Sequence, residues 1–201
     1  LSINLIFKKT TIMALCDGLI AAGIARDCNT VNAAVGVDKD LILVNYDDFD
    51  KTLSLATREA DATNSNEGGL TNIELKTGAV QYVFAGTDYS VIPNVTSEVK
   101  DDGDSWFMHS IAFTVYSKKA ADRKTLEALA GARVIAIAVD RSTGLYELFG
   151  ADQGLKLSGL ERAYTGSQSS NFYTVSLATP EIAVIRESSI AELAVGINTA
   201  A

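Results

Sequence analysis

Few side chains of this chain are of the types that carry nucleophilic or metal chemistry. The sequence holds one histidine, His109, and two cysteines, Cys16 and Cys28. A general base is most often a histidine, and a zinc cage needs several His or Cys ligands. The cysteines lie twelve positions apart, which matches neither a zinc knuckle nor a Cys-x-x-Cys pair, so we expect two buried thiols or a local disulfide. His109 lies inside a strand pattern, which favours a core or interface position over a catalytic role.

Two groups of closely spaced aspartates are the other candidates for chemistry. Their members are Asp47, Asp48, Asp50, Asp101, Asp102 and Asp104. Hard cations such as Ca²⁺ prefer clustered carboxylate oxygens, but neither group has the spacing of an EF-hand loop. We therefore expect a solvated acidic surface at both places and no metal site.

The glycine-containing stretches do not match the motifs of phosphate binding or nucleophilic catalysis. A phosphate loop needs Gly, four residues and then Gly-Lys followed by Ser or Thr, and residues 150–156 (GADQGLK) fail that pattern. Residues 166–170 (GSQSS) lack the second glycine of a nucleophile elbow. We predict that the chain is not an enzyme and needs no cofactor.

Composition favours one folded domain that repels nucleic acid. The chain has 201 residues, of which 47% are hydrophobic, and its formal net charge is −8. This length and apolar fraction are enough for one substantial core. A negative excess repels phosphate backbones and anionic lipid, so we expect DNA to pass nearby without being bound, and no association with membranes.

The N-terminus has two interpretations. Lys8 and Lys9 precede an apolar stretch, as in a signal peptide, but Asp17 interrupts that stretch. The simpler interpretation is that Met13 is the true start. We expect residues 1–30 to form an N-terminal extension or arm, either as a short buried helix or packed on a partner, and residues 31–201 to form a single β-rich domain.

The hydrophobic periodicity predicts a β-rich domain with one helix. Alternating or continuous apolar runs indicate strands, and one amphipathic stripe that precedes Gly131 indicates a helix at about 118–130, capped by Ser117. We expect hairpins at 70–75 with 80–84 and at 133–140 with 145–149, and an acidic loop over 86–103. The remaining expectations are strands at 40–46, 106–116, 171–178 and 182–186, with a polar connector over 158–170. The fold class is mainly β (α+β): an antiparallel β-sandwich or barrel with one flanking α-helix.

Two regions resemble structural proteins of tailed bacteriophages. Residues 13–29 (MALCDGLIAAGIARDCN), followed by 44–48 (VNYDD), resemble proteins encoded in phage morphogenesis regions. The second half, with residues 134–140 (VIAIAVD) and 145–155 (LYELFGADQGL), is similar in pattern to phage major tail-tube proteins. The resemblance implies a tail-tube-like sandwich that closes into hexameric rings, with a lumen through which the genome travels.

From this resemblance we expect a virion protein, made in the host cytoplasm, whose partners are copies of itself and other virion proteins. The alternatives are a neck, tail-terminator or capsid-surface protein of a phage, or a secreted calcium- or carbohydrate-binding β module. The strand over 106–116 has large apolar groups on both faces, which predicts a central strand or an interface. The candidate interface residues are Trp106, Phe107, Phe113 and Tyr116.

Overall fold

The computed structural model describes residues 36–58, 69–99, 105–116, 119–162, 172–180 and 187–199, all within one compact unit, Ala33–Ala201. Several expectations fall outside these residues. They are the N-terminal arm at 1–30, Cys16, Cys28, the cap at Ser117, the strand at 182–186, and the aspartates Asp101, Asp102 and Asp104.

The larger of two sheets has six strands in the order β2-β10-β7-β6-β1-β3. Its strands are β1 (Asp40–Asn45), β2 (Leu70–Leu75), β3 (Gln81–Ala85), β6 (Val134–Val139), β7 (Tyr146–Phe149) and β10 (Glu192–Thr199). Neighbours pair in antiparallel fashion except β10 and β2, which are parallel. β6 reads VIAIAV and is almost wholly buried, as a central strand covered on both faces should be.

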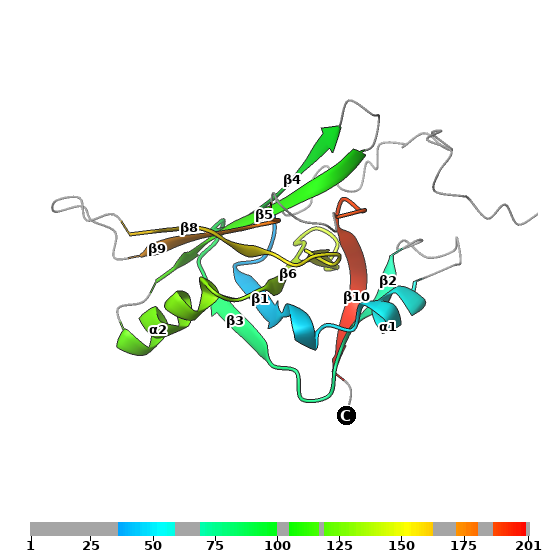
Figure 1. The fold of residues 1–201 in the computed structure, drawn as a ribbon, viewed down its shortest axis with the longest axis horizontal. Coiled ribbons are helices and arrows are strands. Elements are labelled where there is room, and N and C mark those ends of the chain that lie inside the picture. Colours follow the sequence, from blue (N-terminus) through cyan, green and yellow to red (C-terminus); the bar gives the residue numbers. More distant parts are fainter. Residues whose placement is uncertain are drawn as a thin grey trace, which may run out of the picture. The chain divides into compact units, whose positions relative to one another are not determined.

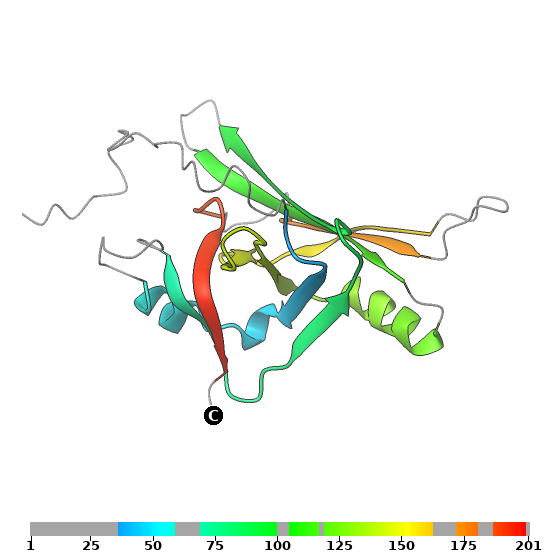
Figure 2. The same ribbon diagram turned by 180° about the vertical axis from the view of Figure 1, so that it is seen from behind.

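The smaller sheet has four antiparallel strands in the order β4-β5-β9-β8. Its strands are β4 (Val91–Val99), β5 (Ser105–Val115), β8 (Lys156–Glu161) and β9 (Tyr173–Ala178). One hydrophobic core joins the two sheets, because Leu43 and Ala136 of the larger sheet belong to the same buried cluster as Ile111 and Val175 of the smaller one. The fold is therefore mainly β and resembles a sandwich (Figures 1 and 2).

Helices play a small part in the described residues. α2 (Ala120–Leu129) places Leu126 and Leu129 in the shared core. A short 3₁₀ segment, η2 (Tyr46–Asp48), leads into α1 (Lys51–Ala56), which the sequence patterns did not predict. None of the helices in the described ranges is sufficiently long and apolar to traverse a lipid bilayer.

The hairpin predicted from residues 70–75 and 80–84 is wrong. Both segments are strands at the expected positions, but β2 pairs with β10, and β3 pairs with β1. A tight turn with Gly78 at φ 82° does lie between them. Alternating apolar residues and a turn indicate strands but do not identify their neighbours, and β10 is more than a hundred residues away.

Two predicted loops contain strands. The expected loop at 86–103 includes β4, and the expected connector at 158–170 begins inside β8. Both are edge strands, so they bury little and tolerate polar residues. Pro93, which suggested a loop, lies in β4, and proline is tolerated in a sheet at an edge. The expected hairpin of β6 with β7 and the strands β1, β5 and β9 are confirmed.

Candidate functional site

A hydrogen-bonded group of ionisable side chains lies beside the loop that joins β7 to β8. We call Lys51, His109, Asp152, Glu187 and Ser188 the polar cluster: His109, Asp152 and Glu187 are buried, Lys51 is partly exposed and Ser188 is exposed. They come from α1, β5, the β7–β8 loop and the residues that precede β10, so the cluster ties together segments far apart in the sequence. Sequence reasoning missed all of these residues except His109.

Glu187 is at the centre of this cluster and is 0% exposed. Its two carboxylate oxygens accept hydrogen bonds from the backbone N–H groups of Asp152 and Gln153, each at 3.0 Å. Its backbone carbonyl accepts from Phe107 N–H at 3.1 Å. Burial raises the pKa of Glu187, and the two amide donors oppose this without cancelling it. The carboxylate therefore holds the loop by satisfying two buried amides.

His109 is fixed in one tautomer by its two neighbours. Its Nδ1 accepts from Gly150 N–H at 3.1 Å, and its Nε2 lies 2.8 Å from the carbonyl oxygen of Ser189. A backbone N–H can only donate and a carbonyl can only accept, so the imidazole is neutral and carries its proton on Nε2. The ring is 1% exposed and packs edge-on against Phe149. The expectation that His109 is a core residue is confirmed.

Asp152 links the loop to α1 and to the start of β10. One carboxylate oxygen bonds to the Lys51 ammonium, and the other accepts from the N–H and hydroxyl of Ser188. Burial raises the pKa of Asp152, but the hydrogen bonds from Lys51 and Ser188 outweigh burial and hold it below its usual value. The pKa of Lys51 is raised: burial lowers it, and the bond to Asp152 reverses that effect.

The geometry of the cluster suits structural cohesion better than a reaction. A general acid or base must reach the proton of a substrate, whereas Glu187 and His109 are enclosed and bonded to protein groups. Within the described ranges, no group of three or more His, Cys, Asp or Glu residues is placed to hold a metal ion.

The candidate interface residues of β5 are mostly buried within the chain. Trp106 is buried and donates its indole N–H to Glu98 at 3.0 Å, and Phe113 lies in the shared core against Phe84. Phe107 is half-buried. Tyr116 is 53% exposed, and its hydroxyl lies 3.2 Å from the hydroxyl of Thr87. Only Tyr116 of the four is open enough to meet another chain.

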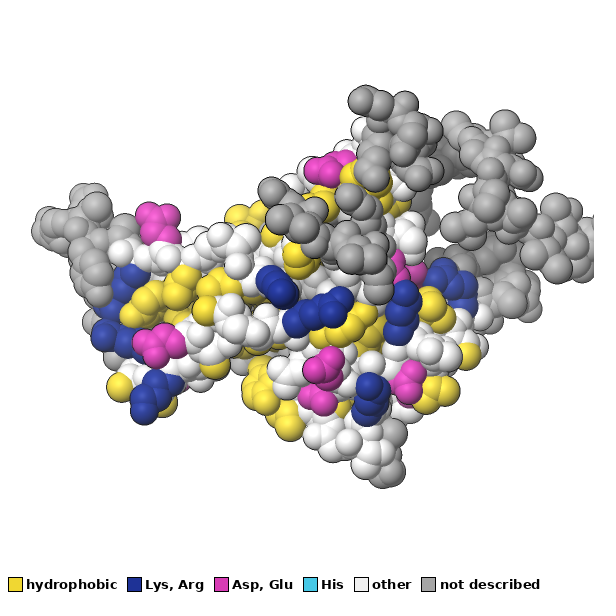
Figure 3. Space-filling model, in the orientation of Figure 1, with side chains coloured by type: hydrophobic (Ala, Val, Ile, Leu, Met, Phe, Trp, Pro, Cys, Tyr) yellow, Lys and Arg dark blue, Asp and Glu magenta, His cyan; other side chains and the backbone are white. Residues whose placement is uncertain are grey.

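The described aspartates of the acidic surface have local structural partners. Asp50 caps α1 by accepting from Leu53 N–H at 2.9 Å, and Asp48 accepts from the side chain of Asn45. Asp47 is exposed. On the face drawn in Figure 3, acidic side chains stand among basic and hydrophobic ones and do not form one large patch.

Several exposed hydrophobic side chains lie on edge strands of the sheets, where sequence reasoning did not place an interface. Val83 on β3 is 60% exposed and Ile92 on β4 is 61% exposed. Others on edge strands are Tyr82, Val99 and Leu160, and Val80 immediately precedes β3. Leu53 of α1 and Val195 of the inner strand β10 are exposed as well. Large apolar groups at an unpaired edge favour association with another chain.

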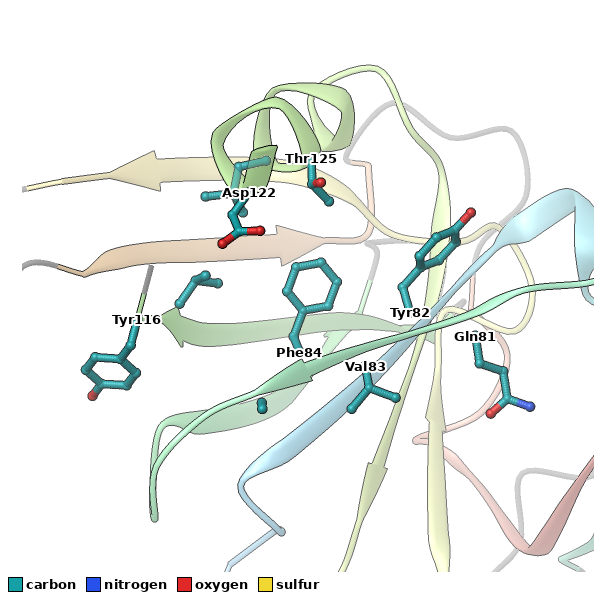
Figure 4. Close-up of a pocket in the computed structure, with 10 residues that line it drawn as sticks. Gln81, Tyr82, Val83, Phe84, Tyr116, Asp122 and Thr125 are labelled. Atoms are coloured by element: carbon teal, nitrogen blue, oxygen red, sulfur yellow. The ribbon is translucent and has the colours of Figure 1, made fainter. Parts of the chain in front are cut away.

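A groove runs between edge strand β3 and helix α2. Tyr82 and Phe84 point towards α2, where they face Asp122 and Thr125, while Gln81 and Val83 point away (Figure 4). Two cavities of about 450 and 360 Å³ lie along this groove, and both are lined by Tyr82, Phe84 and Thr125. The second cavity is more apolar, with Leu129 and Val134 in its wall.

Comparison with known proteins does not assign this chain to a family. No family model matches the sequence, and no match was found among the curated proteins or the solved structures.

Proposed function

We propose that this chain is a structural subunit that assembles with copies of itself, as a phage tail-tube protein does when its rings stack into a conduit for DNA ejection. The observation that carries the proposal is the set of exposed hydrophobic side chains on edge strands, among them Ile92 and Val99 on β4. A monomer would keep these edges in water, whereas a neighbouring subunit would cover them.

Two further features support this proposal. Glu187 and His109 of the polar cluster are enclosed and hydrogen-bonded to protein groups, which favours a role for the cluster in holding the fold. The net charge of −8 suits a conduit that must let DNA pass without binding it. The sandwich-like fold with α2 at its flank is of the kind that the tail-tube resemblance implies.

Electron microscopy of the purified protein tests the proposal directly. We expect rings or stacked tubes as the protein concentration is raised, and averaged end-on images should show six-fold symmetry. The variants compared are Ile92→Lys, which adds a charge on β4, and Glu127→Lys, which reverses a charge on the exposed face of α2 and so changes the net charge of the chain more than Ile92→Lys does. Ile92→Lys should reduce assembly more than Glu127→Lys does.

Dispersed monomers at every concentration would overturn the proposal. Assembly into particles without a central channel would favour another virion role, such as a neck or capsid-surface protein. Copy number in purified particles provides a second measurement, because a tube subunit is expected among the most abundant virion proteins.

A further inference from the structure

Three of the four sheet edges in the described residues carry a feature that opposes pairing with another chain. The outer edge of β2 is occupied by the segment around α1: Thr71 N–H donates to Thr57 O, and Asp50 N–H donates to Glu74 O, both at 3.0 Å. β4 contains Pro93, which has no N–H to donate. β8 shifts its register against β9 between Leu157 and Gly159. Coverage, proline and bulges are recognised ways of protecting an edge.

Strand β3 has none of these protections. It pairs with β1 along one side and is the last strand of the sheet. Its sequence, QYVFA, contains no charge, proline or glycine, and four of its five residues are exposed. An uncharged, regular and exposed edge is a ready template for a further strand.

We propose that β3 pairs in antiparallel fashion with β3 of a second copy of this chain, about a two-fold axis at Val83. A second copy is the occupant that the edges favour, because β3 is the one unprotected edge in the described part of the chain and a partner strand needs an unprotected edge too. The pairing is isologous: the same patch serves both subunits.

The side chains of β3 suit this register. With Val83 opposite Val83, Tyr82 lies opposite Phe84 of the partner subunit, and Gln81 lies opposite Ala85 of the partner subunit. Aromatic cross-strand pairs are favourable, and no like charges meet because the strand has none. Tyr82 and Phe84 also face the groove beside α2, so an arriving tyrosine would fill part of the 450 Å³ cavity.

This two-fold contact is separate from ring formation. An isologous contact closes on itself and cannot propagate into a ring, so a ring would need other surfaces, such as the exposed side chains of Ile92 and Val99, which can pack against a neighbour without strand pairing. The contact would instead join subunits in pairs, in solution or between assemblies. It can therefore be tested whether or not rings form.

Site-directed disulfide formation tests the register. In a chain with Cys16→Ser and Cys28→Ser, Val83→Cys places one thiol on each side of the axis. Opposite Cα atoms in antiparallel strands lie about 4.5–5.5 Å apart, a separation that a disulfide spans. We expect rapid oxidation to a covalent dimer. The matched control is Ile92→Cys, equally exposed but on the proline-containing edge β4, which should cross-link more slowly.

Mass measurement in solution tests the same contact without cross-linking. We expect the unmodified chain to show a species of twice its 21.3 kDa mass, and Val83→Lys to lose that species because two ammonium groups would meet at the axis. Val83 is 60% exposed, so this variant should keep its fold.

Each outcome has a defined meaning. Cross-linking at Val83 no faster than at Ile92, or a doubled mass that survives Val83→Lys, overturns the β3 pairing. Rings without a Val83 cross-link overturn the pairing and leave the proposed function in place. Val83 cross-links without rings support the pairing and overturn the proposed function.

Discussion

Glu187, Ser188 and Ser189 show how three consecutive residues can anchor the start of a strand. The carboxylate of Glu187 accepts two loop amides, Ser188 donates to Asp152, and the carbonyl of Ser189 accepts from His109. β10 begins three residues later and is the neighbour of both β2 and β7. Buried polar groups are costly unless they are paired, so this network specifies one position for the segment.

Replacing Glu187 should change how stability depends on pH. A carboxyl whose pKa is raised on folding stabilises the folded state at pH values below the ordinary pKa of the group, 4.5. This contribution is lost as the pH rises through the raised pKa. We therefore expect Glu187→Gln to remove this loss, so that the stability of the variant rises relative to the unmodified chain as the pH increases from about 4.5 through the raised pKa of Glu187. Urea unfolding across this pH range measures the difference.

The control for this experiment is Glu127→Gln, which removes an exposed carboxylate on α2. Its curve should run parallel to that of the unmodified chain. In Glu187→Gln, the side-chain amide has one oxygen where the carboxylate has two, so it can accept only one of the two loop amides well, and a constant loss of stability at all pH values is also expected. A constant loss with no change of slope would contradict the proton linkage.

At the scale of elements, the sequence identified strands better than it identified their neighbours. β1, β5, β6 and β9 were predicted from apolar runs because each is buried on at least one face. β4 and β8 were missed because edge strands keep polar residues and tolerate Pro93 and Gly159. The pairing of β2 with β10 could not be predicted, because the local sequence of a strand does not identify a partner strand that is distant in the chain.

The candidate site was harder to predict than the fold for the same reason. Lys51, Asp152 and Glu187 meet only after α1, the β7–β8 loop and the start of β10 come together. No sequence spacing connects them. The β3 edge did give a signal, since Val80, Tyr82 and Phe84 alternate strictly, but alternation does not show that one side of a strand lacks a partner.

The β7–β8 loop depends on glycine at position 150. Gly150 has φ 79°, and a Cβ there would lie 2.9 Å from Leu155 Cγ and 3.1 Å from the backbone of Gly154. Gly78 has φ 82°, but a Cβ added there would have no neighbour within 4 Å. An alanine at this position would therefore cause backbone strain without steric overlap. We expect Gly78→Ala to cost roughly 1–2 kcal/mol of unfolding free energy and Gly150→Ala clearly more, because the overlap adds to the strain.

Guanidinium unfolding of the two alanine variants measures this difference. Gly150→Ala should also weaken the bond from Gly150 N–H to His109, since the loop must shift to admit the methyl group. Equal midpoints for the two variants would show that the loop relaxes freely, contrary to its tight hydrogen bonding.

For the molecule as a whole, the net charge acts on a partner over a long distance, whereas the apolar side chains on the edge strands act only on contact. The 25 acidic and 17 basic residues leave a net charge of −8, and on the face in Figure 3 both signs are interspersed. Interspersed charges still allow two copies to meet, because their local fields partly cancel, and the edge side chains of β3 are uncharged. A long polyanion instead experiences the net excess along its length.

We therefore expect the protein to cause no mobility shift of duplex DNA, even at low salt, where electrostatic binding is strongest. The same protein should still associate with itself in low salt, because apolar edge contacts do not require charge neutralisation. A basic DNA-binding protein of similar mass provides the positive control. A shift that weakens with added salt would show a basic surface strong enough to hold phosphates, and would contradict a conduit through which DNA slides freely.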